Sequence, residues 1–210
     1  MRTATKVLLP IGAVAGAVAV RETYQRRLRK PVLTWGATDE EADRRLPGDE
    51  LLEDADIVTT RAITIEAPPS AVWPWLVQMG SGRAGAYTYD WIENLFGLGM
   101  HSSDRIHPEW QHLEVGDMIP GKASLPGLRV ELLEPERALV TRSEDGTWVW
   151  AFVLDEQDSR TRFLSRNRIA MRNPSLGDRL GMAVMEPGSL VMERKMLLGI
   201  KQRAEALAAS

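Results

Sequence analysis

Residues 189–209 constrain the fold more than any other stretch, because their pattern is typical of one long amphipathic helix. The apolar side chains recur at spacings of three and four with charged side chains between them; the apolar ones are Leu190, Met192, Met196, Leu197, Ile200, Ala204 and Leu207. Ser189 is a suitable N-cap, and Pro187-Gly188 predicts a break from a separate short helix over 176–185. A helix of about 20 residues is roughly 30 Å long, so it requires a long apolar surface to pack on.

Strands in the middle of the chain supply this surface. Bulky and polar residues alternate over residues 59–66, 128–133, 138–142, 147–155 and 161–169, and a turn with a short strand is expected over 115–120. Short polar loops join the last four long strands, so we expect an antiparallel meander. On 147–155 one face carries Trp148, Trp150, Phe152 and Leu154 and the other Val149, Ala151 and Val153, while Arg162, Leu164, Arg166 and Arg168 share a face of 161–169. Both faces of the sheet are therefore expected to be at least partly covered.

Two helices are expected between the first strand and the meander, over residues 71–79 and 87–96. The residues between them, Gly80 to Gly85, match the pattern G-x-G-x-x-G. A dinucleotide site needs a strand before these glycines and a helix opening within them. The preceding segment is instead helix-like and contains Pro74, so we interpret the glycines as a flexible turn, with nucleotide binding as the less favoured alternative.

The N-terminal residues point to a membrane. Residues 7–20 contain no charge, and residues 1–30 carry seven basic side chains against Glu22, a net of +6 that leaves −9 for the rest of a chain whose net charge is −3. We expect a short membrane anchor or interfacial segment with the globular domain in the cytoplasm, since basic residues follow the apolar run. Alternatives are a secretory signal cleaved near Ala19 and a poorly ordered tail. The acidic body argues against nucleic-acid binding.

The chain is expected to divide into three parts. Residues 1–30 form the apolar and basic segment, and residues 59–208 form the globular domain. Residues 31–58 connect them and contain a capping box, in which Thr38 caps a short helix to about residue 45 and Glu41 reaches back.

No metal, cofactor or nucleophile signature stands out. The chain has no cysteine, which excludes disulfides and thiolate chemistry. The spacings of His101, His107 and His112 fit no standard zinc pattern. Ser102, Ser103, Asp104 and His107 include the residue types of a hydrolase triad, but no nucleophile elbow surrounds the serines. We therefore expect neither a metal site nor a cofactor here.

The order of strand, two helices, antiparallel meander and long C-terminal helix resembles the helix-grip fold of the START-like, polyketide cyclase/dehydratase and lipid-transport superfamily (SRPBCC). Four segments carry this resemblance, which extends over residues 59–206: ITIEAPPSAVWPWLVQMG, LEVGDMI, VELLEPERALV and MLLGIKQRAE. It implies an α+β fold in which a curved antiparallel sheet wraps around the C-terminal helix, with the N-terminal apolar helix outside the domain.

The resemblance also implies a mainly apolar cavity between the sheet and the final helix. Its expected lining is Trp75, Tyr89, Trp91, Trp148, Trp150, Phe152, Met192 and Met196, with Tyr87, Arg166 and Arg168 at a polar mouth. Ordinary core packing, or an outward salt-bridging face for the arginines, is the alternative. We favour binding or carriage of a hydrophobic small molecule near a membrane. The other readings are a cyclase- or dehydratase-like enzyme that uses Tyr89, Asp90 or Glu93 as acid or base, and an interaction module without a ligand.

Overall fold

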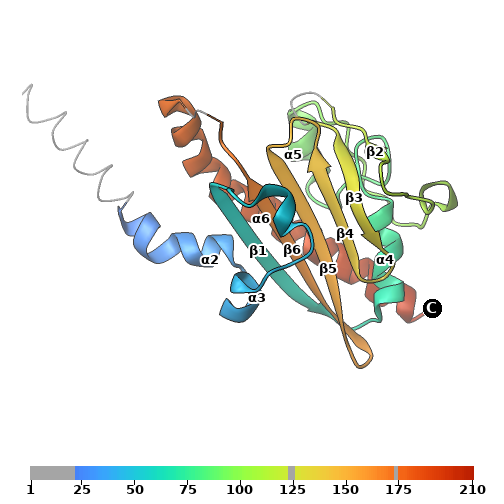
Figure 1. Cartoon of the computed structure of the whole chain (residues 1–210). Helices are drawn as coiled ribbons and strands as arrows, with labels where there is room; N and C mark the ends of the chain where they lie inside the picture. The colour runs from blue at the N-terminus through green and yellow to red at the C-terminus, as the bar shows by residue number, and fades with distance from the viewer. Residues whose placement is uncertain (1–21, 123–125, 173–174) are drawn as a thin grey trace, which may run out of the picture.

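A six-stranded antiparallel sheet in the order β1-β6-β5-β4-β3-β2 forms the body of the protein (Figure 1). The computed structural model describes residues 22–122, 126–172 and 175–210. The strands are β1 (Ile57–Ile65), β2 (Met118–Ile119), β3 (Leu128–Glu134), β4 (Ala138–Ser143), β5 (Trp148–Gln157) and β6 (Arg160–Ile169). The expected meander is present, and β1 pairs with β6 along its whole length, from Ile57 opposite Ile169 to Ile65 opposite Thr161.

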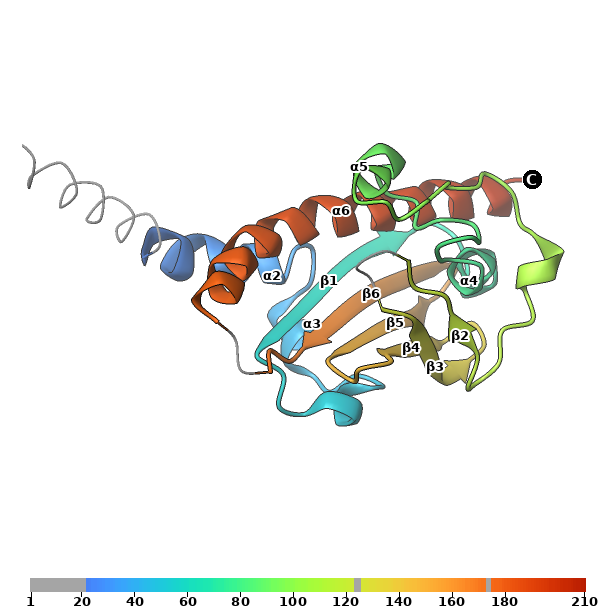
Figure 2. The same cartoon turned by 90° about the horizontal axis from the view of Figure 1, so that it is seen from above.

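Helical segments pack against both faces of this sheet. They are α4 (Pro69–Val77), α5 (Asp90–Leu95) and the long α6 (Leu176–Ala208), with η3 (Pro108–Trp110) in the connection to β2. The N-terminal part forms η1 (Tyr24–Leu28), α2 (Arg29–Leu33), α3 (Asp39–Asp43) and η2 (Asp49–Leu52). Figure 2 shows α6 lying along one side of the curved sheet, the arrangement of a helix-grip fold.

The expected break before residue 189 is wrong, because α6 continues through Pro187 and Gly188. Ser189 does not cap a helix; its hydroxyl donates to the carbonyl of Glu186. Glu186 is itself buried and accepts hydrogen bonds from Arg29 and Tyr24. Together with the bond that Arg61 donates to the Ser189 hydroxyl, these bonds hold the helix on both sides of the proline, which outweighs the single backbone hydrogen bond that a proline removes.

The second predicted helix begins at Asp90 rather than at residue 87. Tyr87 has a φ of 57°, in the left-handed region, so it turns the chain before the helix. This turn sends the Tyr87 side chain into the core, where it is 1% exposed.

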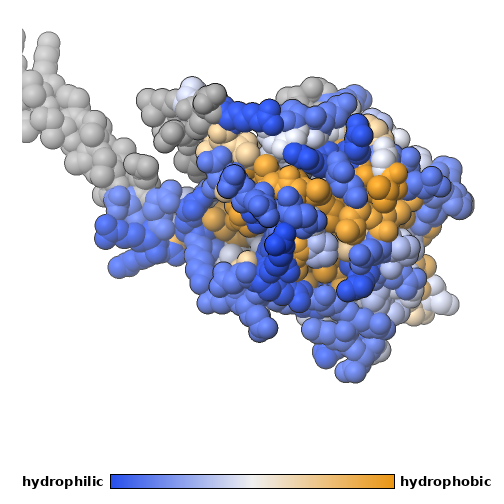
Figure 3. Space-filling view, in the orientation of Figure 1, coloured by the Kyte–Doolittle hydropathy of each residue, from blue (hydrophilic) through white to orange (hydrophobic). Residues whose placement is uncertain are grey.

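The alternation of β5 and β6 divides the sheet into two covered faces, as expected. On the inner face Phe152, Leu154 and Phe163 join one core cluster with Met196 and Ile200 of α6. On the outer face lie two smaller clusters, Leu46 with Ala62, Val153 and Leu164, and Val140 with Val149, Ala151, Leu51 and Leu52. Figure 3 views the molecule from this outer side and shows apolar side chains around η2 and the strands, bordered by hydrophilic ones.

The N-terminal part is bound closely to the domain. The capping box of Thr38 and Glu41 is present as predicted, and the helix that it begins ends at Asp43. Arg29 donates to Glu186 of α6 at 2.7 Å, so the expected boundary at residue 30 falls inside this contact. No helix of the described residues is long and apolar enough to cross a bilayer. The apolar run over 7–20 lies outside the described residues.

Candidate functional site

An apolar cavity of about 80 Å³ lies between the inner face of β3, β4 and β5 and the chain that follows α4. The strands supply Leu128, Leu139, Thr141, Trp148, Trp150 and Phe152; α4 and the turn after it supply Leu76, Met79, Gly80, Ser81 and Ala86; Leu98, Met100, Ile119, Pro120, Gly121, Lys122 and Pro126 complete the wall. No residue of α6 is among these, so the cavity lies beside α4 and not, as expected, under the C-terminal helix.

Aromatic side chains of β5 form one side of the cavity. The rings of Trp148 and Trp150 stack with centroids 5.4 Å apart, and the Trp150 and Phe152 rings follow at 4.7 Å. Both indole N–H groups have partners: Trp148 Nε1 donates to Asn167 Oδ1 at 2.8 Å and Trp150 Nε1 to Ser165 Oγ at 2.9 Å. The polar edges are therefore satisfied within the protein, and the indoles contribute carbon surface to the cavity.

These indoles rest on a buried polar network beneath α6. Asn167 Nδ2 donates to both carboxylate oxygens of Glu193 at 3.3 Å, and Arg61 pairs with the same carboxylate. Arg61 also donates to the Ser189 hydroxyl and the Val32 carbonyl. Burial raises the pKa of the Glu193 carboxyl, and the Arg61 guanidinium opposes this rise. The network fixes the two tryptophans through β6.

Sequence reasoning missed Arg61, Ser165, Asn167 and Glu193. The alternation along the strands could have indicated three of them. Arg61 falls on the same face of its strand as Ile63 and Ile65, and Ser165 and Asn167 fall on the same face as Phe163. Polar residues at inward positions of a strand indicate a buried network, because buried polar groups need partners.

The glycine turn closes one side of the cavity with its own hydrogen bonds. Gly80 and Gly85 exchange both backbone bonds, at 3.0 and 3.2 Å, and the N–H groups of Arg83 and Ala84 bond to the carbonyls of Gly80 and Gln78. Gly85 has a φ of 71°, and a Cβ there would lie 2.8 Å from the backbone of His101. The turn connects no strand to a helix, and the amides of Gly80, Arg83, Ala84 and Gly85 already bond to nearby carbonyls, so it is not built to hold a pyrophosphate.

The expected lining residues divide into two groups. Trp148, Trp150 and Phe152 lie at the cavity wall. Trp75, Met192 and Met196 do not, and Met196 is instead a fully buried core residue on α6 itself. Tyr89 precedes α5 with its ring beneath Lys195 Nζ, and Trp91 is 69% exposed on that helix.

The expected polar mouth is also displaced. Tyr87 is buried against Trp75, with ring centroids 6.0 Å apart, and its hydroxyl donates to the Trp75 carbonyl. Burial raises the pKa of Tyr87 to about 12. Arg166 and Arg168 lie on the opposite face of the sheet, where they bind Asp49 and the backbone of the N-terminal part. The alternation along β6 shows only that the two arginines share a face of the strand. The tertiary structure places that face on the outer side of the sheet.

A second hollow of about 440 Å³ lies between the end of α6 and residues 104–106. Trp75, Lys195, Gln202 and Arg203 contribute to its walls. Arg203 already pairs with Asp104 at 2.5 Å and donates to the Ser103 carbonyl at 2.8 Å. This hollow is open and of mixed polarity, and its Arg203 guanidinium already holds the loop, so the apolar cavity is the better candidate for an apolar ligand.

Ser103, His107 and Glu109 form a hydrogen-bonded series on this loop. Ser103 Oγ lies 2.8 Å from His107 Nε2, and His107 Nδ1 lies 3.3 Å from Glu109 Oε1. The serine oxygen also accepts the N–H of Arg105, and the glutamate is 62% exposed. The series closes a turn and has no buried acid to orient the imidazole, unlike a hydrolase triad. Within residues 22–122, 126–172 and 175–210 no three His, Asp or Glu side chains are grouped to hold a metal.

Comparison with known proteins gives likeness of structure alone. No protein-family model matches the chain, and no curated protein matches it. The similar solved structures include protein BH1534 from Bacillus halodurans, with 16% identity, a TM-score of 0.45, and coverage of 72% of this chain and 99% of that one. The Polyketide_cyc-like protein Cgl2372 from Corynebacterium glutamicum has 14% identity, a TM-score of 0.35, and coverage of 72% and 88%. The Aha1 dimer from Colwellia psychrerythraea has 17% identity, a TM-score of 0.42, and coverage of 71% and 96%.

Identities and TM-scores this low carry no argument about ligand or activity. The helix-grip assignment rests on the chain's own strand order and on the position of α6.

Proposed function

We propose that this protein binds a hydrophobic small molecule in the cavity beside β5 and α4. The observation that supports this function is the row of Trp148, Trp150 and Phe152, whose indole N–H groups are bonded away from the cavity. A wall of fixed aromatic rings offers dispersion contacts to an apolar ligand, and most of its surface exposes no polar group.

The size of the cavity defines the ligand further. At about 80 Å³ it is smaller than the roughly 150 Å³ cavity that accepts benzene in another protein. A small apolar group fits the space as it stands, whereas a longer chain requires the wall to move. The turn with Ser81 and the segment with Leu98 and Met100 are among the parts of the wall outside regular secondary structure that can make such room.

Binding fits the wall better than catalysis. Among the described lining residues Lys122 alone is titratable. Tyr89, Asp90 and Glu93, the groups that a cyclase-like mechanism would use, lie outside the wall, and Asp90 is occupied by the N–H and hydroxyl of Ser102. General acid–base chemistry requires a group within hydrogen-bond reach of the substrate, so the cyclase-like function is the less favoured alternative.

We also propose that this binding takes place beside a membrane. The uncharged residues 7–20 and the basic residues that follow them support an attachment, with the domain on the cytoplasmic side. Arg26 and Arg27 lie on the exposed surface of η1, where they can meet anionic headgroups.

An apolar probe as small as benzene, with its binding followed by NMR, tests the cavity. Trp150→Ala removes the middle ring of the aromatic row, so we expect about a tenfold weaker dissociation constant for the probe. Ala86→Leu fills the cavity and should abolish probe binding without lowering the free energy of unfolding by more than about 1 kcal/mol. The control Trp110→Ala changes a partly buried tryptophan outside the lining. Unchanged probe affinity in both cavity variants would contradict the proposal.

A further inference from the structure

Helix α5 bonds polar side chains to the protein and exposes large apolar side chains. Asp90 accepts the N–H and hydroxyl of Ser102, and Asn94 exchanges two bonds with the backbone of Met100, at 2.8 and 2.6 Å. Glu93 is buried between them, and burial raises the pKa of its carboxyl. This orientation is the reverse of a surface helix in a water-soluble domain.

Three large apolar side chains at the end of this helix and on its outward side are exposed. Trp91 is 69%, Leu95 77% and Phe96 66% exposed. Trp91 and Leu95 are four residues apart, so their side chains lie on the same side of the helix, one turn from each other. A single exposed apolar residue is ordinary, whereas a group of large ones on one short helix indicates a surface that another phase or molecule covers. We call Trp91, Leu95 and Phe96 the α5 face.

Two lysines flank the α5 face. Lys195 of α6 places its ammonium over the Tyr89 ring at the start of the helix, 5.8 Å from the centroid. The Lys122 ammonium lies against Gly99, just after the end of the helix. The acidic groups of the helix turn inward, so the outward charges next to the apolar side chains are positive. Aromatic and aliphatic side chains beside lysines match the interfacial zone of a bilayer with anionic headgroups.

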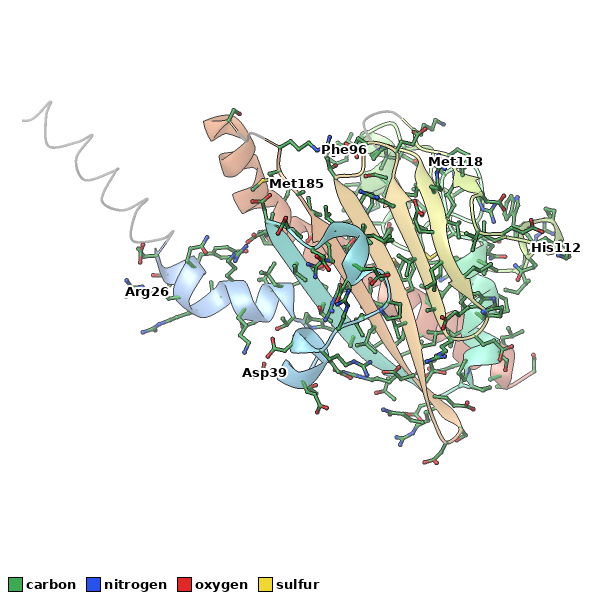
Figure 4. All side chains as sticks on the ribbon, in the orientation of Figure 1. Arg26, Asp39, Phe96, His112, Met118 and Met185 are labelled. Atoms are coloured by element: carbon green, nitrogen blue, oxygen red, sulfur yellow. The ribbon has the colours of Figure 1, made fainter. Side chains whose placement is uncertain are left out.

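The α5 face continues into the wall of the cavity. Phe96 is followed by Leu98 and Met100, which line the cavity, and the Ser81 hydroxyl donates to the Leu98 carbonyl at 2.8 Å. Figure 2 shows α5 standing out on the side of α6 that faces away from the sheet. In Figure 4 Phe96 and Met118 lie toward the same edge of the molecule, and Arg26 marks the basic N-terminal part.

We propose that the α5 face docks on a lipid bilayer that contains anionic lipid. The described chain begins at Glu22, and the 21 residues ahead of it include the uncharged run 7–20, which provides a separate means of bringing the domain to a membrane. The α5 face then sets the orientation of the tethered domain and turns the cavity wall toward the lipid. Passage of an apolar ligand between bilayer and cavity rests on the proposed function; the docking itself does not.

A fluorophore at position 96 tests the docking in the full-length chain. The protein has no cysteine, so Phe96→Cys gives one site for a polarity-sensitive label. We expect vesicles of phosphatidylcholine with phosphatidylglycerol to raise and blue-shift the emission at position 96, and lipids with a quencher on the acyl chain to reduce it. The same label introduced by Val115→Cys, at an exposed residue that is 62% accessible outside the α5 face, should not respond.

The two labels separate docking from mere tethering. Vesicle binding by sedimentation without a response at position 96 would overturn the proposal, because the other segment alone would hold the protein. A response that depends on protein concentration and not on lipid would replace the bilayer by a second copy of this chain.

A substitution in the α5 face gives the complementary measurement. The triple variant Trp91→Ser, Leu95→Ser and Phe96→Ser should lower the vesicle partition coefficient about tenfold, since binding follows the apolar area buried. The exposed pair Val115→Ser and Leu207→Ser is the control. Probe binding to the cavity without vesicles should stay unchanged in the triple variant, so a failure of docking is distinct from a failure of the proposed ligand binding.

Discussion

Arg166 shows how one side chain holds a separate part of the chain to the sheet. Its Nε donates to Thr60 Oγ1 at 2.9 Å and its Nη1 to Asp49 Oδ2 at 2.7 Å. Three further bonds go to the carbonyls of Glu41, Ala42 and Arg44. The side chain is 2% exposed, and burial lowers the pKa of its guanidinium, which the Asp49 carboxylate opposes. All donors of this arginine are thus used inside the protein.

Arg166→Met is therefore expected to lower the free energy of unfolding by about 3–5 kcal/mol, because it removes the closer of the two arginines that pair with Asp49 and leaves three carbonyls without this donor. Arg137→Met is the control; that arginine is 78% exposed beside Glu134, and its loss should cost less than about 0.5 kcal/mol. Urea denaturation of both variants measures the difference. Equal effects would mean that the N-terminal part contributes little to the fold.

At the scale of the element, α6 contains two glycines with opposite surroundings. A Cβ on Gly199 would lie 2.6 Å from the carbonyl oxygen of Tyr87, closer than real Cβ contacts. A Cβ on Gly188 would meet nothing within 4 Å. Gly199 thus allows the helix to approach the turn at Tyr87, where the Arg203 guanidinium covers the tyrosine ring at 4.8 Å.

The same substitution at these two positions should have opposite effects. Gly188→Ala should raise the free energy of unfolding by about 0.5–1 kcal/mol, since alanine favours the helix. Gly199→Ala should lower it by about 1–3 kcal/mol, because backbone must move to admit the methyl group. Urea denaturation with a helix signal by circular dichroism checks both. A gain in stability from both variants would show that α6 does not approach Tyr87 this closely.

At the scale of the whole molecule, residues 36–53 cover the outer face of the sheet. Leu46, Leu51 and Leu52 pack on the strands, and the Arg162 guanidinium bonds to Glu41 at 2.7 and 2.8 Å. The arginine lowers the pKa of the Glu41 carboxyl below its ordinary 4.5, and the Thr38 N–H adds to this effect. The cover is thus held by packing together with an ionised carboxylate.

Acid should weaken this cover. A carboxyl whose pKa is lower in the folded state contributes stability above its unfolded pKa, and loses it as the pH falls through the folded pKa. Between pH 6 and pH 3, approximate limits either side of 4.5, the wild type should lose more free energy of unfolding than Glu41→Gln, which cannot titrate there. Urea titrations across the range measure this slope, with the exposed Glu156→Gln as control. Parallel slopes in wild type and Glu41→Gln would contradict it.

Local patterns predicted much of this architecture. The alternation assigned Trp148, Trp150 and Phe152 to one face of their strand, and the short loops predicted the meander. The capping box of Thr38 and Glu41 is present as predicted. Each of these features depends on residues a few positions apart, so the sequence contains all the information that they require.

The cavity, the displaced arginines and the continuous α6 were decided by contacts distant in sequence. A period of two shows which residues share a face of β6, but the packing of α6 and of residues 36–53 determines that Asn167 faces the tryptophans and Arg166 faces Asp49. Pro187 and Gly188 predict a break locally, and the bonds of Glu186 and Ser189 to Arg29 and Arg61 override it. By itself the sequence determined the elements and their faces, because these follow from local geometry. The tertiary structure decided which face encloses the cavity, since that depends on what each face packs against.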